Sequence, residues 1–139
     1  MACKAVRRSP SGVALKLSLY RVKSYDILKS SKGDEIKPKD GNKFVVAFMR
    51  VENLKKDEIS YLIINGLFLN YDSGKQPATA MGDYGKIDDL EQIYADIDSG
   101  ASVSGFIVFE VPEDKNEFKM TDEGCENSIE IKEADIIKG

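Results

Sequence analysis

Apolar and polar residues alternate along several stretches of the chain, and this alternation predicts β-strands. In residues 13–20 every odd position is apolar, whereas Lys16 and Ser18 are polar. A period of two is the strand signature, because successive side chains point to opposite faces of a sheet. In residues 43–53 apolar residues fill both faces as far as Arg50, which is typical of a strand covered on both sides. We predict strands near residues 13–20, 43–53, 61–71, 102–111 and 127–132.

The same alternation assigns the strand residues to two faces of the predicted sheet. The predicted core contains Val45, Ala47, Met49, Val51, Leu67, Leu69, Ile107 and Phe109. The opposite face carries five large apolar residues, which are Phe44, Val46, Phe48, Phe106 and Val108. Large apolar side chains on an outer face need a cover. Either the segment 76–98 folds over them, or they form a partner-binding face for another protein or for a second copy of the chain.

The segments between the predicted strands are mostly polar turns. Asn65-Gly66 predicts a hairpin turn or a bulge within residues 61–71. Residues 76–98 lack alternation, and the spacing of apolar residues there indicates at most a short helix near residues 87–94. The sequence therefore predicts an all-β fold, an immunoglobulin-like antiparallel β-sandwich of about seven strands. We expect residues 1–11 to be a flexible N-terminal tail and residues 12–139 to form a single domain.

Composition and charge exclude several classes of partner. The net charge of −4 gives no electrostatic footprint for nucleic acid. No apolar run approaches the roughly 18 residues that a membrane-spanning helix requires. Pro10 and Lys16 interrupt the residues that follow Arg7 and Arg8, so we expect no signal peptide in this chain. We therefore expect neither nucleic acid nor a membrane span, and a protein, a cell-envelope component or a second copy of the chain stays open as a partner.

Catalytic chemistry has little support in the sequence. The chain has no histidine, which excludes Ser-His-Asp and Cys-His nucleophile systems and histidine-ligated metals. It also has no Gly-rich phosphate loop. Asp96 and Asp98 before Gly100 could begin a calcium loop, but a tight turn prefers the same residues and no carboxylate stands where an EF-hand needs its last ligand. We therefore expect no enzyme activity, no cofactor and no metal.

The two cysteines lie almost a whole chain apart. Cys3 and Cys125 have neither the number nor the spacing of a structural zinc site. They are either two separate thiols or a disulfide that joins the chain ends. Since Cys3 falls in the expected tail, we predict that they are not bridged.

Three segments carry a resemblance to a known family. They are Gly41-Asn-Lys-Phe-Val-Val-Ala-Phe-Met-Arg-Val-Glu-Asn53, Leu67-Phe-Leu-Asn-Tyr-Asp-Ser-Gly74 and Ser99-Gly-Ala-Ser-Val-Ser-Gly-Phe-Ile-Val-Phe-Glu-Val-Pro112. In this order and spacing they resemble the telokin-like, immunoglobulin-fold domain of unknown function found in secreted proteins and lipoproteins, mostly of Gram-positive bacteria. The resemblance covers roughly residues 12–121. It implies a small extracellular or cell-surface sandwich that binds something, with no established reaction. Cys3 could then be a lipid-modified cysteine or an ordinary one.

Two functions follow from these observations. The first is a non-catalytic binding or interaction module, extracellular or at the cell surface by resemblance, with a cytoplasmic location as the alternative. The second is a small immunoglobulin-like proteinase inhibitor. An inhibitor needs a rigid exposed loop, and residues 73–85, which include Pro77 and Met81, are the candidate.

Overall fold

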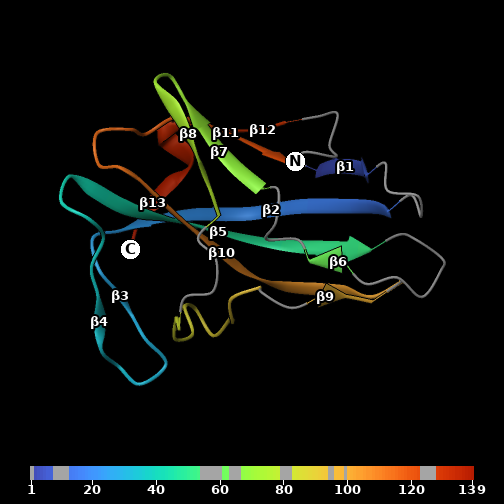
Figure 1. Ribbon diagram of the computed structural model, residues 1–139, viewed down its shortest axis with the longest axis horizontal. Coiled ribbons are helices and arrows are strands. Elements are labelled where there is room, and N and C mark those ends of the chain that lie inside the picture. Colours follow the sequence, from blue (N-terminus) through green and yellow to red (C-terminus); the bar gives the residue numbers. More distant parts are fainter. Residues whose placement is uncertain are drawn as a thin grey trace.

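The computed structural model of the chain describes residues 2–7, 13–53, 61–62, 67–78, 83–93, 96–98, 100–122 and 128–139. The strands form two principal sheets that share one buried core, with two short two-stranded ribbons beside them (Figure 1). The helical structure within the described residues is one short 3-10 turn, η1 (Glu133–Asp135). The predicted all-β sandwich is therefore confirmed.

The larger sheet is built around three long antiparallel strands. Its order is β1 (Ala2–Arg7), β2 (Val13–Tyr25), β5 (Asn42–Asn53) and β10 (Ser102–Pro112). A short C-terminal strand, β13 (Ile136–Lys138), also pairs with β2, in parallel. The long blue, green and orange strands of Figure 1 are β2, β5 and β10.

The smaller sheet packs against one face of the larger one. Its order is β12 (Ile129–Ile131), β11 (Phe118–Asp122), β7 (Leu67–Tyr71) and β8 (Gly74–Pro77). The two ribbons pair β3 (Leu28–Lys29) with β4 (Glu35–Ile36), and β6 (Tyr61–Leu62) with β9 (Asp96–Ile97). Asn65 and Gly66 lie outside the described residues, so the predicted hairpin turn there stays a prediction.

The core between the two sheets, which we call the inter-sheet core, contains the residues that alternation predicted. All eight predicted core residues are fully buried. The inter-sheet core consists of Leu17, Val22, Val45, Ala47, Met49, Val51, Leu67, Leu69, Ala78, Ile93, Ile107, Phe109, Val111, Phe118, Met120, Ile129 and Ile131. Because burial of one large apolar side chain contributes about 1.5–3 kcal/mol, this cluster is the main source of stability.

Strand β2 exchanges its two faces at a β-bulge. Leu19 pairs with Met49 of β5 and Arg21 pairs with Phe48, so that Tyr20 is the extra residue and lies 59% exposed. Odd residues such as Leu17 enter the inter-sheet core before the bulge, and the even residue Val22 enters it afterwards. The bulge therefore turns the following odd residues to the outer face of the larger sheet.

Residues 2–7 of the predicted N-terminal tail are a strand in the structure, and residues 1 and 8–11 lie outside the described ranges. Residues 2–7 form β1, which pairs antiparallel with β2 from Ala2 opposite Ser18 to Arg7 opposite Val13. The backbone of an edge strand offers a row of donors and acceptors whatever its side chains are, so pairing there needs no strong apolar alternation.

Where the spacing of apolar residues allowed at most a short helix near residues 87–94, residues 87–90 form a hairpin turn. Ile87 and Leu90 exchange two backbone hydrogen bonds of 3.0 Å, which close a two-residue turn at Asp88 and Asp89. Both central residues have positive φ, 52° and 64°, as a type I′ hairpin turn requires. The three-residue spacing from Ile87 to Leu90 thus belongs to a hairpin tip, and Tyr94 lies outside the described residues.

Candidate functional site

The five residues of the predicted partner-binding face form a second buried cluster, which we call the outer core. Phe44, Val46, Phe48, Phe106 and Val108 are at most 2% exposed. Their cover comes from the chain itself: the buried Leu28 and the half-buried Tyr25, Ile36, Tyr84, Ile87 and Leu90. The chain itself therefore covers these five side chains, through β3, β4 and residues 84–90, and does not leave them open to a partner as the second alternative had it.

Residues 83–93 cross the outer core, and we call them the strap. At its first end Gly85 N–H donates to the carbonyl of Lys29 at 2.8 Å, and Ser31 N–H donates to the carbonyl of Asp83 at 3.1 Å. At its other end Ile93 N–H donates to the carbonyl of Phe106 at 2.9 Å. The strap therefore spans from the β3–β4 ribbon to β10. Its tip, residues 86–90, lies between these two attachments.

A glycine permits the strap to lie against β10. Gly105 faces residues 91–93, and a Cβ at this position would overlap the carbonyl oxygen of Glu91 and the Cγ1 atom of Ile93. Phe106 N–H donates to that same Glu91 carbonyl at 3.1 Å. Gly105 thus serves a close backbone approach, whereas the register of β10 against β5 runs unbroken past it.

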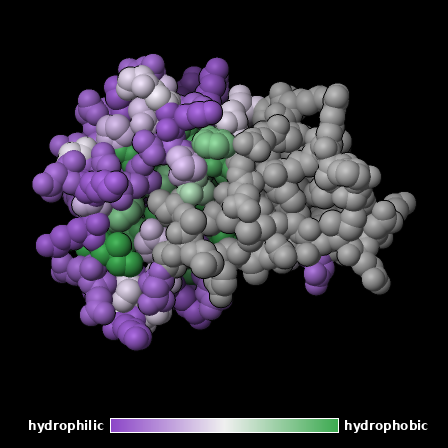
Figure 2. All heavy atoms as spheres, in the orientation of Figure 1, coloured by the Kyte–Doolittle hydropathy of each residue, from purple (hydrophilic) through white to green (hydrophobic). Residues whose placement is uncertain are grey.

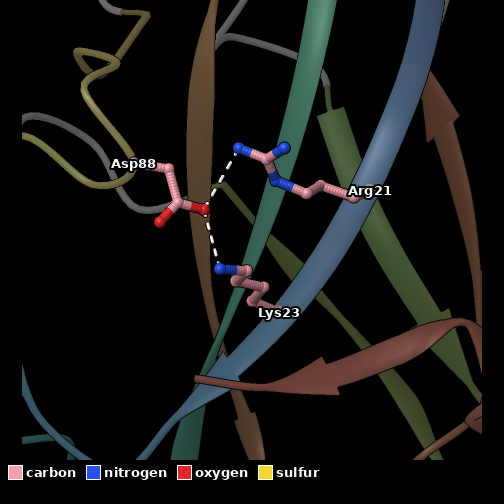
Figure 3. Close-up of polar contacts among 3 residues, drawn as sticks. All are labelled: Arg21, Lys23 and Asp88. Carbon is pink, nitrogen blue, oxygen red and sulfur yellow. Dashed lines mark ion pairs between the residues drawn. The ribbon is translucent and has the colours of Figure 1, made fainter.

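The tip of the strap is joined to β2 by two ion pairs. The Asp88 carboxylate lies 3.1 Å from Nη2 of Arg21 and 2.7 Å from Nζ of Lys23, and Figure 3 shows both contacts. Arg21 also covers the ring of Phe48, with 4.6 Å from its guanidinium carbon to the ring centroid. The hydrogen bond from Lys23, with the positive charges of both basic residues, lowers the pKa of Asp88. Charge thus sits at the rim of the outer core.

A groove of about 760 Å³ lies at the end of the smaller sheet. It is formed by β7, β11 and β12 and by the turn after β10. Its walls include Asn70, Tyr71, Phe118, Lys119, Glu130 and Lys132. Tyr71 and Phe118 meet edge to face, with ring centroids 6.2 Å apart, so the groove has an aromatic floor between charged walls.

Two polar contacts fix the rim of the groove. Nζ of Lys115 lies 2.8 Å from Oδ1 of Asp72, and this hydrogen-bonded ion pair lowers the pKa of Asp72 and raises the pKa of Lys115. Nζ of Lys43 donates to Oδ1 of Asn116 at 2.6 Å, and burial lowers the pKa of Lys43. Such a groove can hold a ligand by hydrogen bonds, charge and aromatic contact.

The outward surface of the described residues is mainly polar. On the face shown in Figure 2, hydrophilic residues surround small apolar areas. The exposed large apolar residues within the described ranges are Tyr20, Ile27 and Ile137. No helix among the described residues is long and apolar enough to cross a membrane.

In the candidate calcium loop, Asp96 lies in β9, and Asp98, Gly100 and Ala101 have the geometry of a turn. Ala101 N–H donates to the carbonyl of Asp98 at 3.0 Å, and Gly100 has a φ of +72°. A tight turn requires a positive φ at this position, and glycine adopts it readily. In the part of the chain that the structure describes, no group of three or more acidic, cysteine or histidine residues is placed to hold a metal ion.

The cysteine and inhibitor hypotheses fall partly outside the described residues. Cys3 lies in β1, opposite Leu17, but Cys125 is not described, so their pairing stays a prediction. In the candidate inhibitory loop, residues 74–77 form β8, which is paired with β7. Residues 79–82, with Met81, lie outside the described ranges.

Sequence reasoning missed both the Asp88 ion pairs and the groove. The signal for the first was Asp88-Asp89 between two apolar residues, a two-residue turn that resembles helical spacing when apolar positions alone are counted. Its partners depend on the bulge at Tyr20, which period-two reasoning cannot place. The groove joins residues from three strands and carries no motif, so no local signal pointed to it.

The comparisons with known proteins agree with this architecture. A solved structure from Staphylococcus aureus, titled "Structure of a putative lipoprotein", aligns with a TM-score of 0.60 over 97% of this chain and 97% of that one. At 10% sequence identity this likeness shows the fold alone. No curated protein matches the chain. The family described as Domain of unknown function (DUF4352) matches residues 13–130, and the chain therefore belongs to this family.

Proposed function

We propose that the protein is a non-catalytic binding module that acts outside the cell or at the cell surface. The groove at the end of the smaller sheet carries this proposal, because it combines an aromatic floor with charged and amide side chains on rigid strands. Lys119 and Glu130 are opposite each other on β11 and β12, so their positions are set by the strand register. A pre-formed concave site of this kind suits a binding role.

Charge and chemistry favour binding over turnover. Without histidine, the acid and base groups available are carboxylates, lysines and tyrosines. In the groove the Asp72 carboxylate and the Lys115 amine are paired with each other, and the ion pair favours the charged form of both. A pair held in its charged state contributes to binding and is poorly suited to exchange protons near neutral pH.

The location is proposed from similarity. The staphylococcal structure is titled as that of a "putative lipoprotein", and this title supports a surface-attached module. A lipid attached at Cys3 would place the sandwich close to the membrane surface. Detergent phase partition of the protein made in its native cells tests this: the wild type should enter the detergent phase and Cys3→Ser should stay in water. Equal partition of the two proteins would exclude a lipid anchor at Cys3.

The groove is tested with defined cell-envelope probes. We would titrate the ¹⁵N-labelled chain with soluble peptidoglycan fragments and with wall teichoic acid, and follow amide chemical shifts. Shifts should gather at Asn70, Lys119 and Lys132, and Lys119→Glu should weaken binding at least about fivefold. Lys32→Glu, an exposed charge reversal in the turn between β3 and β4, is the matched control and should leave affinity unchanged. Shifts elsewhere, or none with either probe, would overturn the groove as the site.

The proteinase inhibitor is the alternative outcome. The pairing of residues 74–77 with β7 counts against it, because an inhibitory segment must be free to enter a protease cleft as an extended strand. A panel of serine and cysteine proteases separates the two functions. Stoichiometric inhibition of any of them would favour the inhibitor.

A further inference from the structure

The tip of the strap, residues 86–90, is held to the larger sheet by side chains alone. Within the described residues, its backbone hydrogen bonds are the two between Ile87 and Leu90. The side chains that contact the outer core, Ile87 and Leu90, are only half buried. By contrast, β5 and β10 are paired residue by residue over their whole length. The tip therefore has few contacts to lose if it lifts away.

Three features work against the closed strap. Asp88 and Asp89 both have positive φ, a conformation that side-chain-bearing residues other than glycine adopt at a cost. Nε2 of Gln92 is buried and, among the described residues, has no hydrogen-bond partner. A buried donor without an acceptor loses its bonds to water and gains none in return. Opening the strap would return the Gln92 donor to water.

The Asp88 ion pairs oppose that opening. They join the turn itself to β2, and both basic partners come from the segment that the bulge turns outward. Lys23 has a side-chain exposure of 21%, Arg21 of 41% and Asp88 of 33%, so salt can screen the pairs. Arg21 at the same time lies on Phe48, which places the contact directly over the outer core.

We propose that the strap is a salt-sensitive latch, which the Asp88 ion pairs close over the outer core and which opens to uncover an apolar surface around Phe44 and Phe48. The closed form is the structure described above. Apart from Ile93, the inter-sheet core lies outside the strap, so opening leaves its paired strands in place. The latch shares no residue with the groove, so its test is independent of the test of the proposed binding function.

The test compares Asp88→Asn with Asp89→Asn. Both variants remove one negative charge from the same turn, and asparagine tolerates positive φ as aspartate does. Only the first removes the ion pairs with Arg21 and Lys23. Hydrogen exchange of the Gly85 and Ile93 amides, whose bonds close the two ends of the strap, reports its opening. Binding of an apolar fluorescent dye reports exposure of the outer core.

We expect the two strap amides to exchange roughly two- to tenfold faster in Asp88→Asn, with increased dye binding and unchanged exchange in the β5–β10 ladder. Asp89→Asn should have the amide exchange rates and the dye binding of the wild type. Raising NaCl from about 0.01 M to about 1 M shortens the Debye length from about 30 Å to about 3 Å. The exchange rates and dye binding of the wild type should then approach those of Asp88→Asn. Equal exchange in the two variants, an equal change in the β5–β10 ladder, or no effect of salt would each overturn the latch.

Discussion

The two faces of the larger sheet are covered in different ways. On one face the smaller sheet contributes three strands whose buried residues alternate, as in Ile129 and Ile131 of β12. On the other face the cover is a ribbon of two-residue strands and the strap, whose apolar side chains are mostly half buried. The inter-sheet core is therefore closed by hydrogen-bonded strands, whereas the outer core is closed by a few side chains and ion pairs.

This difference shows how the burial of both faces of a strand affects its sequence pattern. Residues 43–49 of β5 are all buried, so the strand is an almost continuous apolar run. Strand β12 has one exposed residue between two buried ones, because one of its faces meets water. A continuous run thus indicates that a cover exists, but not whether it is a second sheet, a loop or a partner.

The largest difference between the two cores should appear when one phenylalanine is truncated in each. Phe109→Ala should lower the free energy of unfolding by about 3–5 kcal/mol, because paired strands surround the cavity and cannot close it. Phe44→Ala should cost less, since the half-buried Tyr84 ring, 6.4 Å from the Phe44 ring, can move inward. Urea denaturation of both variants measures this. Equal losses would mean that the outer core is as rigid as the inter-sheet core.

Much of the fold was predictable because one rule governs it. Alternation assigned the eight core residues correctly, from Val45 to Phe109, since a one-residue slip would turn every side chain of a strand to the wrong face. It could not predict the bulge at Tyr20, because a bulge is an exception to period two. Nor could it distinguish a hairpin tip from a helical turn at Ile87 and Leu90, where both place apolar residues three apart.

The candidate site was less predictable for a related reason. Alternation identified the five outer residues as apolar and in need of a cover, and the covering strap lies in the segment 76–98 that the sequence offered for that role. The closing contacts of the strap depend on Arg21 and Asp88, which are far apart in sequence and are brought together by the tertiary fold. Contacts of this kind carry no local pattern, so the sequence alone does not reveal them.

The second prediction concerns the attachment of the strap to β10. Gly105→Ala should destabilise the protein by about 1–3 kcal/mol, because the added methyl group would overlap the Glu91 carbonyl and Ile93. Gly74→Ala is the matched control: its Cβ would lie 3.4 Å from the nearest atoms of the Tyr71 side chain, an ordinary contact, and the change should stay within about 0.5 kcal/mol. Thermal unfolding compares them. A Gly105→Ala protein as stable as the control would mean that the strap does not need this close approach.

The third prediction concerns the turn of the strap. Asp89→Gly should stabilise the protein by up to about 1 kcal/mol, because glycine adopts the φ of 64° without steric cost. Asp88→Gly relieves the same kind of strain at 52° but also removes both ion pairs, so it should bring no gain. The midpoints of urea unfolding separate the two effects. If both glycine variants gain equally, the ion pairs contribute nothing to closing the outer core.

The smallest expected effect is the acid dependence of the latch. The hydrogen bond from Lys23 and the nearby positive charges hold the pKa of Asp88 below its ordinary value of 3.8. A carboxylate with a lowered pKa in the folded protein stabilises it above the unfolded pKa, and this contribution is lost as the pH falls through the folded pKa. Near pH 5 the strap amides should therefore be better protected from exchange in the wild type than in Asp88→Asn. Well below pH 3.8 this difference in protection should disappear.

The Asp72 carboxylate provides the control for this acid effect. The hydrogen bond from Lys115 also lowers the pKa of Asp72, but that pair lies at the groove and not at the strap. Asp72→Asn should therefore leave the exchange of the Gly85 and Ile93 amides, and its pH dependence, as in the wild type. Because the Asp88 pairs are partly exposed, their contribution should be below about 1 kcal/mol and is best measured by exchange at these amides. An identical loss of protection in Asp72→Asn and Asp88→Asn would show that acid acts on net charge rather than on the contact that closes the outer core.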